Sequence, residues 1–209
     1  LKKFGVGSPT GLQFPGESQG YVPDPEHWSA TSFGTIAFGQ GLSMNAVQAA
    51  SIYATIANDG VRVSPTLISG YTAADGRFQA AAPAASRRVV SVATARTMRM
   101  MLESVVSDEG TAPMAAIPGY RVAGKTGTAD RANPDPHGSR YKGFTSSFIG
   151  MAPADNPSLV VAVILDNPRN GHYGGVLAGP VFKRVMTYSL EHFRVPPTSV
   201  ARPQIPVTW

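Results

Sequence analysis

The chain has 209 residues and a formal net charge of +5, with 43% hydrophobic and 15% charged residues. This composition is that of a globular domain large enough for a substantial core, and it excludes a disordered or coiled-coil chain. The basic residues are scattered without interleaved aromatic residues, so nucleic-acid binding is not expected, and the absence of cysteine excludes disulfides and thiol chemistry.

The first 60 residues are expected to form loops followed by one helix. Residues 1–40 are rich in Gly, Pro and Ser and show no sustained period, which predicts loops with short elements. A helix is predicted from Ser43, as its N-cap, to about Asp59, with Gly60 ending it. Its predicted apolar stripe consists of Val47, Ala50, Tyr53, Ala54 and Ala57.

Residues 61–110 predict a surface excursion and a second helix. Short extended pieces are expected over 61–90. The helix is predicted to begin at Ser91 or Thr94 and to end at Gly110. Its arginines, Arg96 and Arg99, are expected to face solvent. The predicted apolar stripe consists of Met98, Met101, Leu102 and Val105.

The second half of the chain has β character. Strands are predicted over 120–129, 144–152 and 158–166, and the last two are joined by a turn at 153–157. The third strand is apolar without interruption, which predicts that both of its faces are covered. Pro180 is expected to open a terminal helix that ends near Phe193, and the Pro-rich residues 195–209 are expected to be an extended tail.

The segment Lys125-Thr126-Gly127-Thr128 on the first of these strands is the strongest functional signal. Lysine, a hydroxyl residue and glycine in this order form one of three motifs of serine acyl-transfer enzymes that act on penicillin. A lysine ammonium can attract a substrate carboxylate and a developing oxyanion. Period two places Thr126 and Thr128 on one side, where two hydroxyls can hold a carboxylate. Gly127 lets a peptide-like substrate approach the backbone, so that the Thr128 N–H can reach the reacting carbonyl oxygen.

The tripeptide alone also fits an ordinary strand with an exposed lysine, so the segments around it decide whether it is a functional motif. The accompanying segments resemble the transpeptidase domain of penicillin-binding proteins, and within it the class B group that includes the septal cell-division enzyme. The resemblance runs from residue 1 to about residue 197. The segments that carry it are Phe38-Gly39-Gln40-Gly41, residues 48–60, residues 119–129, residues 148–153, and Tyr173-Gly174-Gly175 with Gly179-Pro180.

The resemblance implies an α+β, β-lactamase/transpeptidase-like fold with an antiparallel sheet flanked by helices. Only part of that fold is contained in this chain: residues 1–194 correspond to its C-terminal part, and 195–209 form the tail. The upstream remainder, as a further segment or as a second chain, is expected to complete the sheet, because strands without their neighbours and covering helices are not stable.

Two motifs that the family requires, S-x-x-K with the nucleophile and S-x-N, are expected to lie upstream. Ser139 and Lys142 match S-x-x-K by letter, but they follow the K-T-G strand in a Gly/Pro loop. The true motif needs a helical turn that aims the lysine at the serine hydroxyl. Ser43 and Asn45 match S-x-N, yet Ser43 is better explained as a helix cap. The chain by itself is therefore expected to be inactive.

By resemblance, the complete protein is a D,D-transpeptidase that cross-links peptidoglycan stem peptides through a serine acyl-enzyme in septal wall synthesis. Lys125 is the candidate for catalytic electrostatics and the Thr128 N–H for one oxyanion donor. Thr126, Gly127 and Thr128 are candidates for binding substrate and β-lactams.

The implied partners are stem peptides, β-lactam antibiotics, the upstream part of the protein, and division or wall-synthesis proteins. No cofactor or metal is implied, and the expected location is the extracytoplasmic face of the bacterial membrane, with an N-terminal anchor outside this chain.

Alternatives are a serine β-lactamase or D,D-carboxypeptidase of the same fold, and a non-catalytic β-lactam-binding or sensor domain. A class A β-lactamase requires a glutamate in an E-x-x-L-N context before the K-T-G, which none of the glutamates here has. A substituted nucleophilic serine upstream would favour the sensor domain. The four histidines lack metal-ligand spacing, and His172, beside Tyr173, is expected to have a loop role.

Overall fold

The chain forms an α+β fold, as predicted. The computed structural model describes residues 1–133, 135–139, 141–198 and 201. The helices are η1 (Lys2–Phe4), η2 (Pro25–His27), α1 (Ser32–Ala37), α2 (Ala46–Ala57), α3 (Val92–Ser104), η3 (Pro113–Ala115) and α4 (Gly174–His192). The strands are β1 (Val61–Val63), β2 (Gly70–Thr72), β3 (Phe78–Ala80), β4 (Ser86–Arg88), β5 (Ala123–Ala132), β6 (Tyr141–Ala152) and β7 (Leu159–Asp166).

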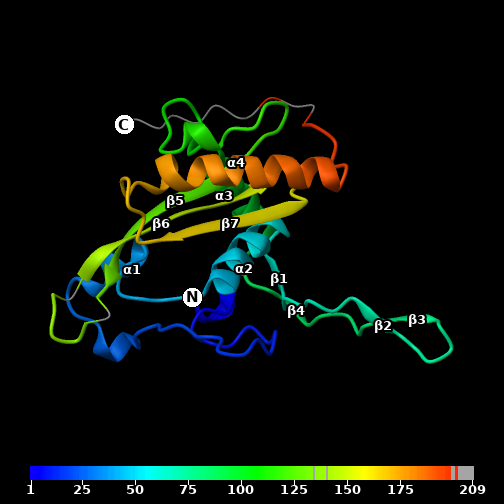
Figure 1. The fold of residues 1–209 in the computed structure, drawn as a ribbon, viewed down its shortest axis with the longest axis horizontal. Coiled ribbons are helices and arrows are strands. Elements are labelled where there is room, and N and C mark those ends of the chain that lie inside the picture. The colour runs from blue at the N-terminus through cyan, green and yellow to red at the C-terminus, as the bar shows by residue number, and fades with distance from the viewer. Residues whose placement is uncertain (134, 140, 199–200, 202–209) are drawn as a thin grey trace.

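Strands β5, β6 and β7 form an antiparallel sheet that is covered by helices on both faces. Figure 1 shows α4 lying along one face, where it contacts all three strands, while α2 and α3 lie on the other. The larger core lies beneath α4, where the rings of Phe148 and Phe182 meet at 4.7 Å between centroids. On the opposite face, Met151 packs with Ile56 of α2. Strand β5 is therefore fixed between two helical layers.

Helix α2 is present, but its cap and its buried face differ from the prediction. Asn45, not Ser43, is the N-cap: its side chain accepts a hydrogen bond from the Gln48 backbone, and the Gln48 side chain accepts one from the Asn45 N–H. Val47 and Ala54 of the predicted stripe are exposed. The helix instead buries a polar side chain, because the Gln48 amide donates to three carbonyls of the N-terminal loops. The inward residues are Gln48, Ala49, Ser51, Thr55 and Ile56.

Replacing Asn45 with alanine is expected to destabilise the protein by roughly 0.5–2 kcal/mol, because the first turn of α2 loses its side-chain cap. Ser43→Ala is the matched control and should leave stability unchanged, since Ser43 is exposed and pairs with Tyr21 through its backbone. Urea denaturation of the complete protein measures both variants. An equal loss of stability in Ser43→Ala would mean that Ser43, and not Asn45, caps the helix.

Helix α3 begins as predicted and faces the core differently. Ser91 caps it by accepting from the Thr94 N–H at 3.0 Å. Met98 and Met101 are exposed, whereas Ala95, Arg99 and Glu103 are buried. The expectation that Arg99 faces solvent is therefore wrong, although Arg96 is exposed. The reason is long-range pairing: the Arg99 guanidinium donates to the Ile56 carbonyl and to Asp59, each at 2.9 Å.

The terminal helix starts earlier than predicted. It begins at Gly174, so that Pro180 lies inside it instead of opening it. Interior proline removes one helical hydrogen bond, a cost that the packing of α4 on the sheet offsets. Strand β7 contacts α4 and α2, as expected for a strand covered on both faces, but it is an edge strand of the described sheet and Ile164 remains exposed.

Residues 61–90 form the predicted surface excursion. β1 pairs with β4, and β2 with β3, in a ribbon that projects away from the sheet (Figure 1). At the other end of the chain, residues 195–198 return to the segment before β5, where the Tyr120 hydroxyl donates to the Val195 carbonyl at 2.7 Å. Residues 199–200 and 202–209 of the predicted tail lie outside the described residues. Among the helices that are described, none has the length and apolar character needed to cross a membrane.

Candidate functional site

The Lys125–Thr128 segment lies on β5 at an edge of the sheet. β6 pairs along one side of it, with Lys125 opposite Ile149 and Thr128 opposite Ser146. In the part of the chain that the structure describes, no strand pairs with the other side. Alternate residues of β5 therefore direct their N–H and C=O groups toward this open side, where an extended, peptide-like ligand can add, as peptides do at exposed strand edges. The Thr126 carbonyl already accepts a hydrogen bond from Lys125.

The Thr126 and Thr128 hydroxyls lie on one side of the strand, toward α4, and each has a protein partner. Thr128 Oγ1 accepts a hydrogen bond from the Gly174 N–H at 3.1 Å. Thr126 Oγ1 shares a hydrogen bond of 3.2 Å with Thr111 Oγ1. A hydroxyl that accepts one hydrogen bond keeps its own hydrogen for donation. Thr128 Oγ1 can therefore still donate to a carboxylate, and Thr126 Oγ1 can do so when Thr111 is the donor in their shared hydrogen bond.

The Lys125 ammonium lies close to the Thr126 hydroxyl. Its Nζ donates to the Thr126 carbonyl and to Thr126 Oγ1, each at 3.1 Å. Partial burial of this ammonium lowers the pKa of Lys125 below its ordinary value. None of the described carboxylates lies within ion-pair distance of Nζ. Lys125 thus adds an uncompensated positive charge beside the Thr126 hydroxyl, an arrangement that attracts an anionic ligand.

Gly127 lies next to the Ser147 side chain of the neighbouring strand. A Cβ at this position would lie 2.4 Å from Ser147 Oγ on β6. The sequence suggested only that glycine clears space for a substrate. The structure adds that a side chain at Gly127 would also make the Ser147 hydroxyl rotate to another position.

Several residues beside the segment carried no clear sequence signal. Phe144, His172 and Tyr173 form an aromatic group, with ring centroids 4.5 Å apart for the first pair and 4.2 Å for the second. The Ser146 hydroxyl donates to the His172 carbonyl. His172 is in a loop, as expected, but that loop lies immediately before Gly174, the partner of Thr128. The run from His172 to Gly175 was the one feature of the sequence that could have indicated this neighbourhood.

The two motifs matched by letter lie in other settings than a helical turn with a nucleophile. The Ser139 hydroxyl donates to the Tyr141 carbonyl at 2.8 Å, and Lys142 lies on strand β6. Ser43 lies in a bridge with Tyr21. It lines a cavity of about 770 Å³ at the C-terminal end of β5, enclosed mainly by residues 29–43 and 129–132.

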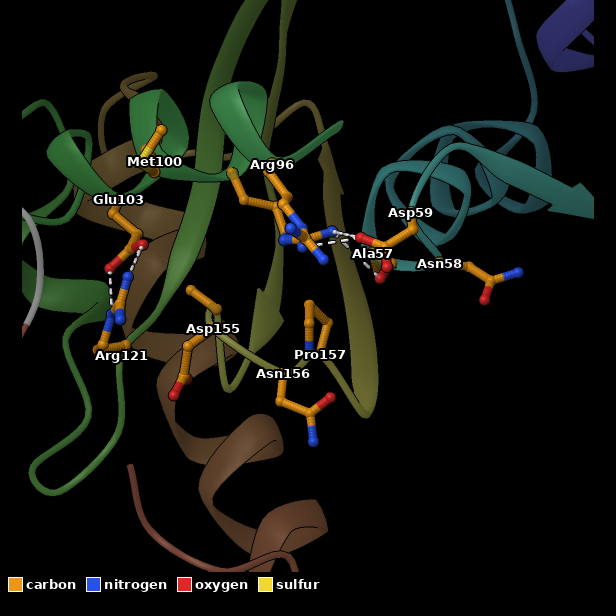
Figure 2. A pocket seen from close by; sticks show the side chains of 12 residues that line it. Ala57, Asn58, Asp59, Arg96, Met100, Glu103, Arg121, Asp155, Asn156 and Pro157 are labelled. Atoms are coloured by element: carbon orange, nitrogen blue, oxygen red, sulfur yellow. Dashed lines mark hydrogen bonds and ion pairs between the residues drawn. The ribbon is translucent and has the colours of Figure 1, made fainter. Parts of the chain in front are cut away.

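A second cavity, of about 520 Å³, lies at the N-terminal entry to β5 (Figure 2). Two ion pairs lie in its wall. Glu103 accepts two hydrogen bonds from Arg121, at 2.6 and 2.8 Å (Figure 2), and Asp59 accepts one from Arg99. These pairs tie α3 to the start of β5 and to the end of α2. Because their charges are matched, the geometry favours a structural role. The described residues include no cluster of acids or histidines able to hold a metal ion.

Comparison with known proteins agrees with this geometry. A family model described as the penicillin binding protein transpeptidase domain matches residues 1–187. Penicillin-binding protein PbpB of Mycolicibacterium smegmatis is 42% identical over an alignment of 205 residues, and the match covers 94% of this chain and 32% of PbpB. The "Probable peptidoglycan D,D-transpeptidase PbpC" of Pseudomonas aeruginosa is 39% identical over 201 residues, 96% of this chain and 34% of PbpC.

Solved structures agree as well. The crystal structure of penicillin binding protein 3 from Mycobacterium tuberculosis, complexed with ampicillin, matches with a TM-score of 0.87 and 40% identity. The match covers 97% of this chain and 47% of that one. The chain spans about a third of the length of the curated relatives named above. The sequence, the sheet and its helices, and these matches together place the chain in the penicillin-binding protein transpeptidase domain family.

Proposed function

We propose that the complete protein containing this chain is a peptidoglycan D,D-transpeptidase of septal wall synthesis. The observation that carries the proposal is the Lys125–Thr128 segment on an open strand edge, in a chain of this family. The names of PbpC and PbpB support the activity and the class of enzyme. We place the protein on the extracytoplasmic face of the bacterial membrane, anchored by a segment upstream of this chain.

The reaction is acyl transfer through a serine supplied by the upstream part of the protein. The serine oxygen attacks the carbonyl carbon of the penultimate D-Ala of a stem peptide, and the bond to the terminal D-Ala nitrogen breaks. The terminal D-Ala leaves with a proton on its nitrogen. The amine of a neighbouring stem peptide then attacks the ester, which forms the cross-link and returns a proton to the serine.

The residues of this chain bind and polarise the substrate in both steps. Lys125 provides positive potential for the terminal carboxylate and for the developing oxyanion, a type of stabilisation that is large in a preorganised site. The Thr126 and Thr128 hydroxyls donate to the carboxylate, and the Thr128 N–H donates to the reacting carbonyl oxygen. β-Lactams acylate the same serine as substrate mimics, and no metal or organic cofactor takes part.

Fluorescent penicillin and intact-mass spectrometry test the proposal. The complete protein should gain one penicillin per molecule, on a serine outside residues 1–209, and should release it slowly. Residues 1–209 alone should not be labelled. Rapid turnover of penicillin would instead indicate a β-lactamase, and the absence of any adduct would indicate a binding or sensor domain. An adduct on Ser43 or Ser139 would refute the upstream nucleophile. Incubation with stem peptides and an acceptor amine separates cross-linking from simple release of D-Ala by a carboxypeptidase.

A further inference from the structure

The first turn of α4 packs directly against the Lys125–Thr128 strand, through two buried glycines. A Cβ on Gly174 would lie 2.3 Å from the Ser147 carbonyl oxygen and 2.4 Å from the Gly127 carbonyl oxygen. A Cβ on Gly175 would lie 2.1 Å from the Thr111 carbonyl oxygen. The Ser147 and Gly127 carbonyls belong to the sheet and cannot move independently of it, whereas Thr111 lies in the loop before η3. The distance between helix and strand is therefore set by the absence of side chains at the two positions.

Backbone conformation does not explain these glycines. Both lie in an α-helix, outside the left-handed region, so alanine is allowed at either position. Alanine is also the better helix former, by about 1 kcal/mol in a helix interior. Glycine at 174 and 175 therefore weakens the helix locally while permitting the close approach. The consequence of that approach is the hydrogen bond from the Gly174 N–H to Thr128 Oγ1, at 3.1 Å.

We propose that Gly174 is a positioning residue for the Thr128 hydroxyl. By donating to Oγ1, its N–H occupies one lone pair and holds the exposed Thr128 side chain in one orientation, so that the O–H hydrogen remains available to the substrate carboxylate. A methyl group at residue 174 forces the helix and the strand apart by on the order of 1 Å, which breaks this hydrogen bond. The hydroxyl is then free to turn away from the carboxylate. This inference rests on the proposed function, since it requires a carboxylate ligand at β5.

The chain offers a matched control in the same helix. A Cβ on Gly179 would lie 3.7 Å from its nearest neighbour, the Ala115 nitrogen, which is an ordinary contact. Gly179→Ala therefore adds a methyl group to the same helix without a clash against another element, and thermal unfolding measures the local cost of alanine before Pro180. A difference in acylation rate between Gly174→Ala and Gly179→Ala therefore measures the effect of the contact between residue 174 and strand β5.

The experiment compares acylation of the complete protein by a penicillin and by the methyl ester of the same penicillin, in which the carboxylate is blocked. In Gly174→Ala, the second-order acylation rate constant for the free acid is expected to fall roughly 10- to 100-fold, the range for one hydrogen bond to a charged group. The rate constant for the ester should change little. Gly179→Ala should leave both rate constants unchanged.

The same assay tests whether Gly174 acts through the Thr128 hydroxyl. Thr128→Val adds no atom against α4 and should cause the same selective loss for the free acid, even if Gly174→Ala fails to fold. Thr128→Ser, which keeps the hydroxyl, should retain the preference for the acid. In the Thr128→Val background, Gly174→Ala should not lower the ratio of acid to ester rates any further.

Equal slowing of acid and ester in Gly174→Ala would overturn the proposal, because a general distortion of the site would then explain the loss. An unchanged acid-to-ester ratio in Thr128→Val would overturn it as well. Failure of the proposed function has a different result, since the wild-type protein would then either form no adduct with penicillin or turn it over rapidly.

Discussion

Replacing Lys125 with alanine in the complete protein is expected to slow acylation by penicillin by about 10²–10³-fold, the typical cost of removing one preorganised electrostatic donor. The ammonium lies 3.1 Å from Thr126 Oγ1 and has no carboxylate partner among the described residues, so its charge is available to the ligand. Its loss should act mainly on the transition state, where negative charge develops on the carbonyl oxygen. Second-order rate constants from fluorescent penicillin labelling measure the effect.

Lys142→Ala is the matched control for Lys125→Ala. Lys142 is an exposed lysine on the adjacent strand β6, and it belongs to the S-x-x-K match that the structure does not support. Its replacement should leave acylation unchanged. Equal rates for Lys125→Ala and the wild type would mean that the K-T-G segment is only structural, provided that thermal unfolding shows both proteins to be folded.

Replacing Glu103 with glutamine is expected to destabilise the protein by roughly 3–5 kcal/mol, the usual cost of breaking a buried ion pair by removing one partner. The Glu103 side chain is 2% exposed and that of Arg121 14% exposed, and they share two hydrogen bonds. Glutamine keeps the volume but leaves the arginine charge without its counter-ion. Urea denaturation, followed by circular dichroism and by residual penicillin labelling, measures the shift.

Two further variants test whether the loss of stability in Glu103→Gln comes from breaking a buried ion pair. The double variant Glu103→Leu/Arg121→Met should recover much of the lost stability, since apolar pairs can replace buried ion pairs without large cost. Asp75→Asn breaks an exposed pair with Arg77 on the projecting ribbon and should have no measurable effect. A loss in Asp75→Asn similar to that in Glu103→Gln would show that the cost does not depend on burial.

Local patterns predicted the elements that depend on local chemistry. Ser91 caps α3, as the pattern of a hydroxyl residue before a helical segment indicated. The strand that carries Lys125, the turn between β6 and β7, and the excursion over 61–90 follow from alternation and from glycine and proline positions. The candidate segment was therefore readable before the fold was known, whereas the α+β class came from the resemblance to the family.

Buried polar residues explain most of the errors in predicting which faces of α2 and α3 point toward the core. Apolar periodicity correctly placed Tyr53, Leu102 and Val105 against the core. It wrongly assigned Met98 and Met101 to the inward face, and it missed the buried Gln48, Arg99 and Glu103. Their partners lie far away in the chain: Gln48 bonds Gly5, and Glu103 bonds Arg121. A helical pattern contains no information about a partner on another element, so it counts such residues as exposed.

The sequence by itself determined that a lysine, two hydroxyls and a glycine follow one another on a strand, and that the two hydroxyls share one side of it. That much follows from the period of an extended chain. Only the tertiary structure decided that the first turn of α4 meets this strand and that Gly174 bonds Thr128. The physical reason is that contact between residues 46 positions apart depends on how helix and sheet pack, and packing is set by the absence of side chains at Gly174 and Gly175.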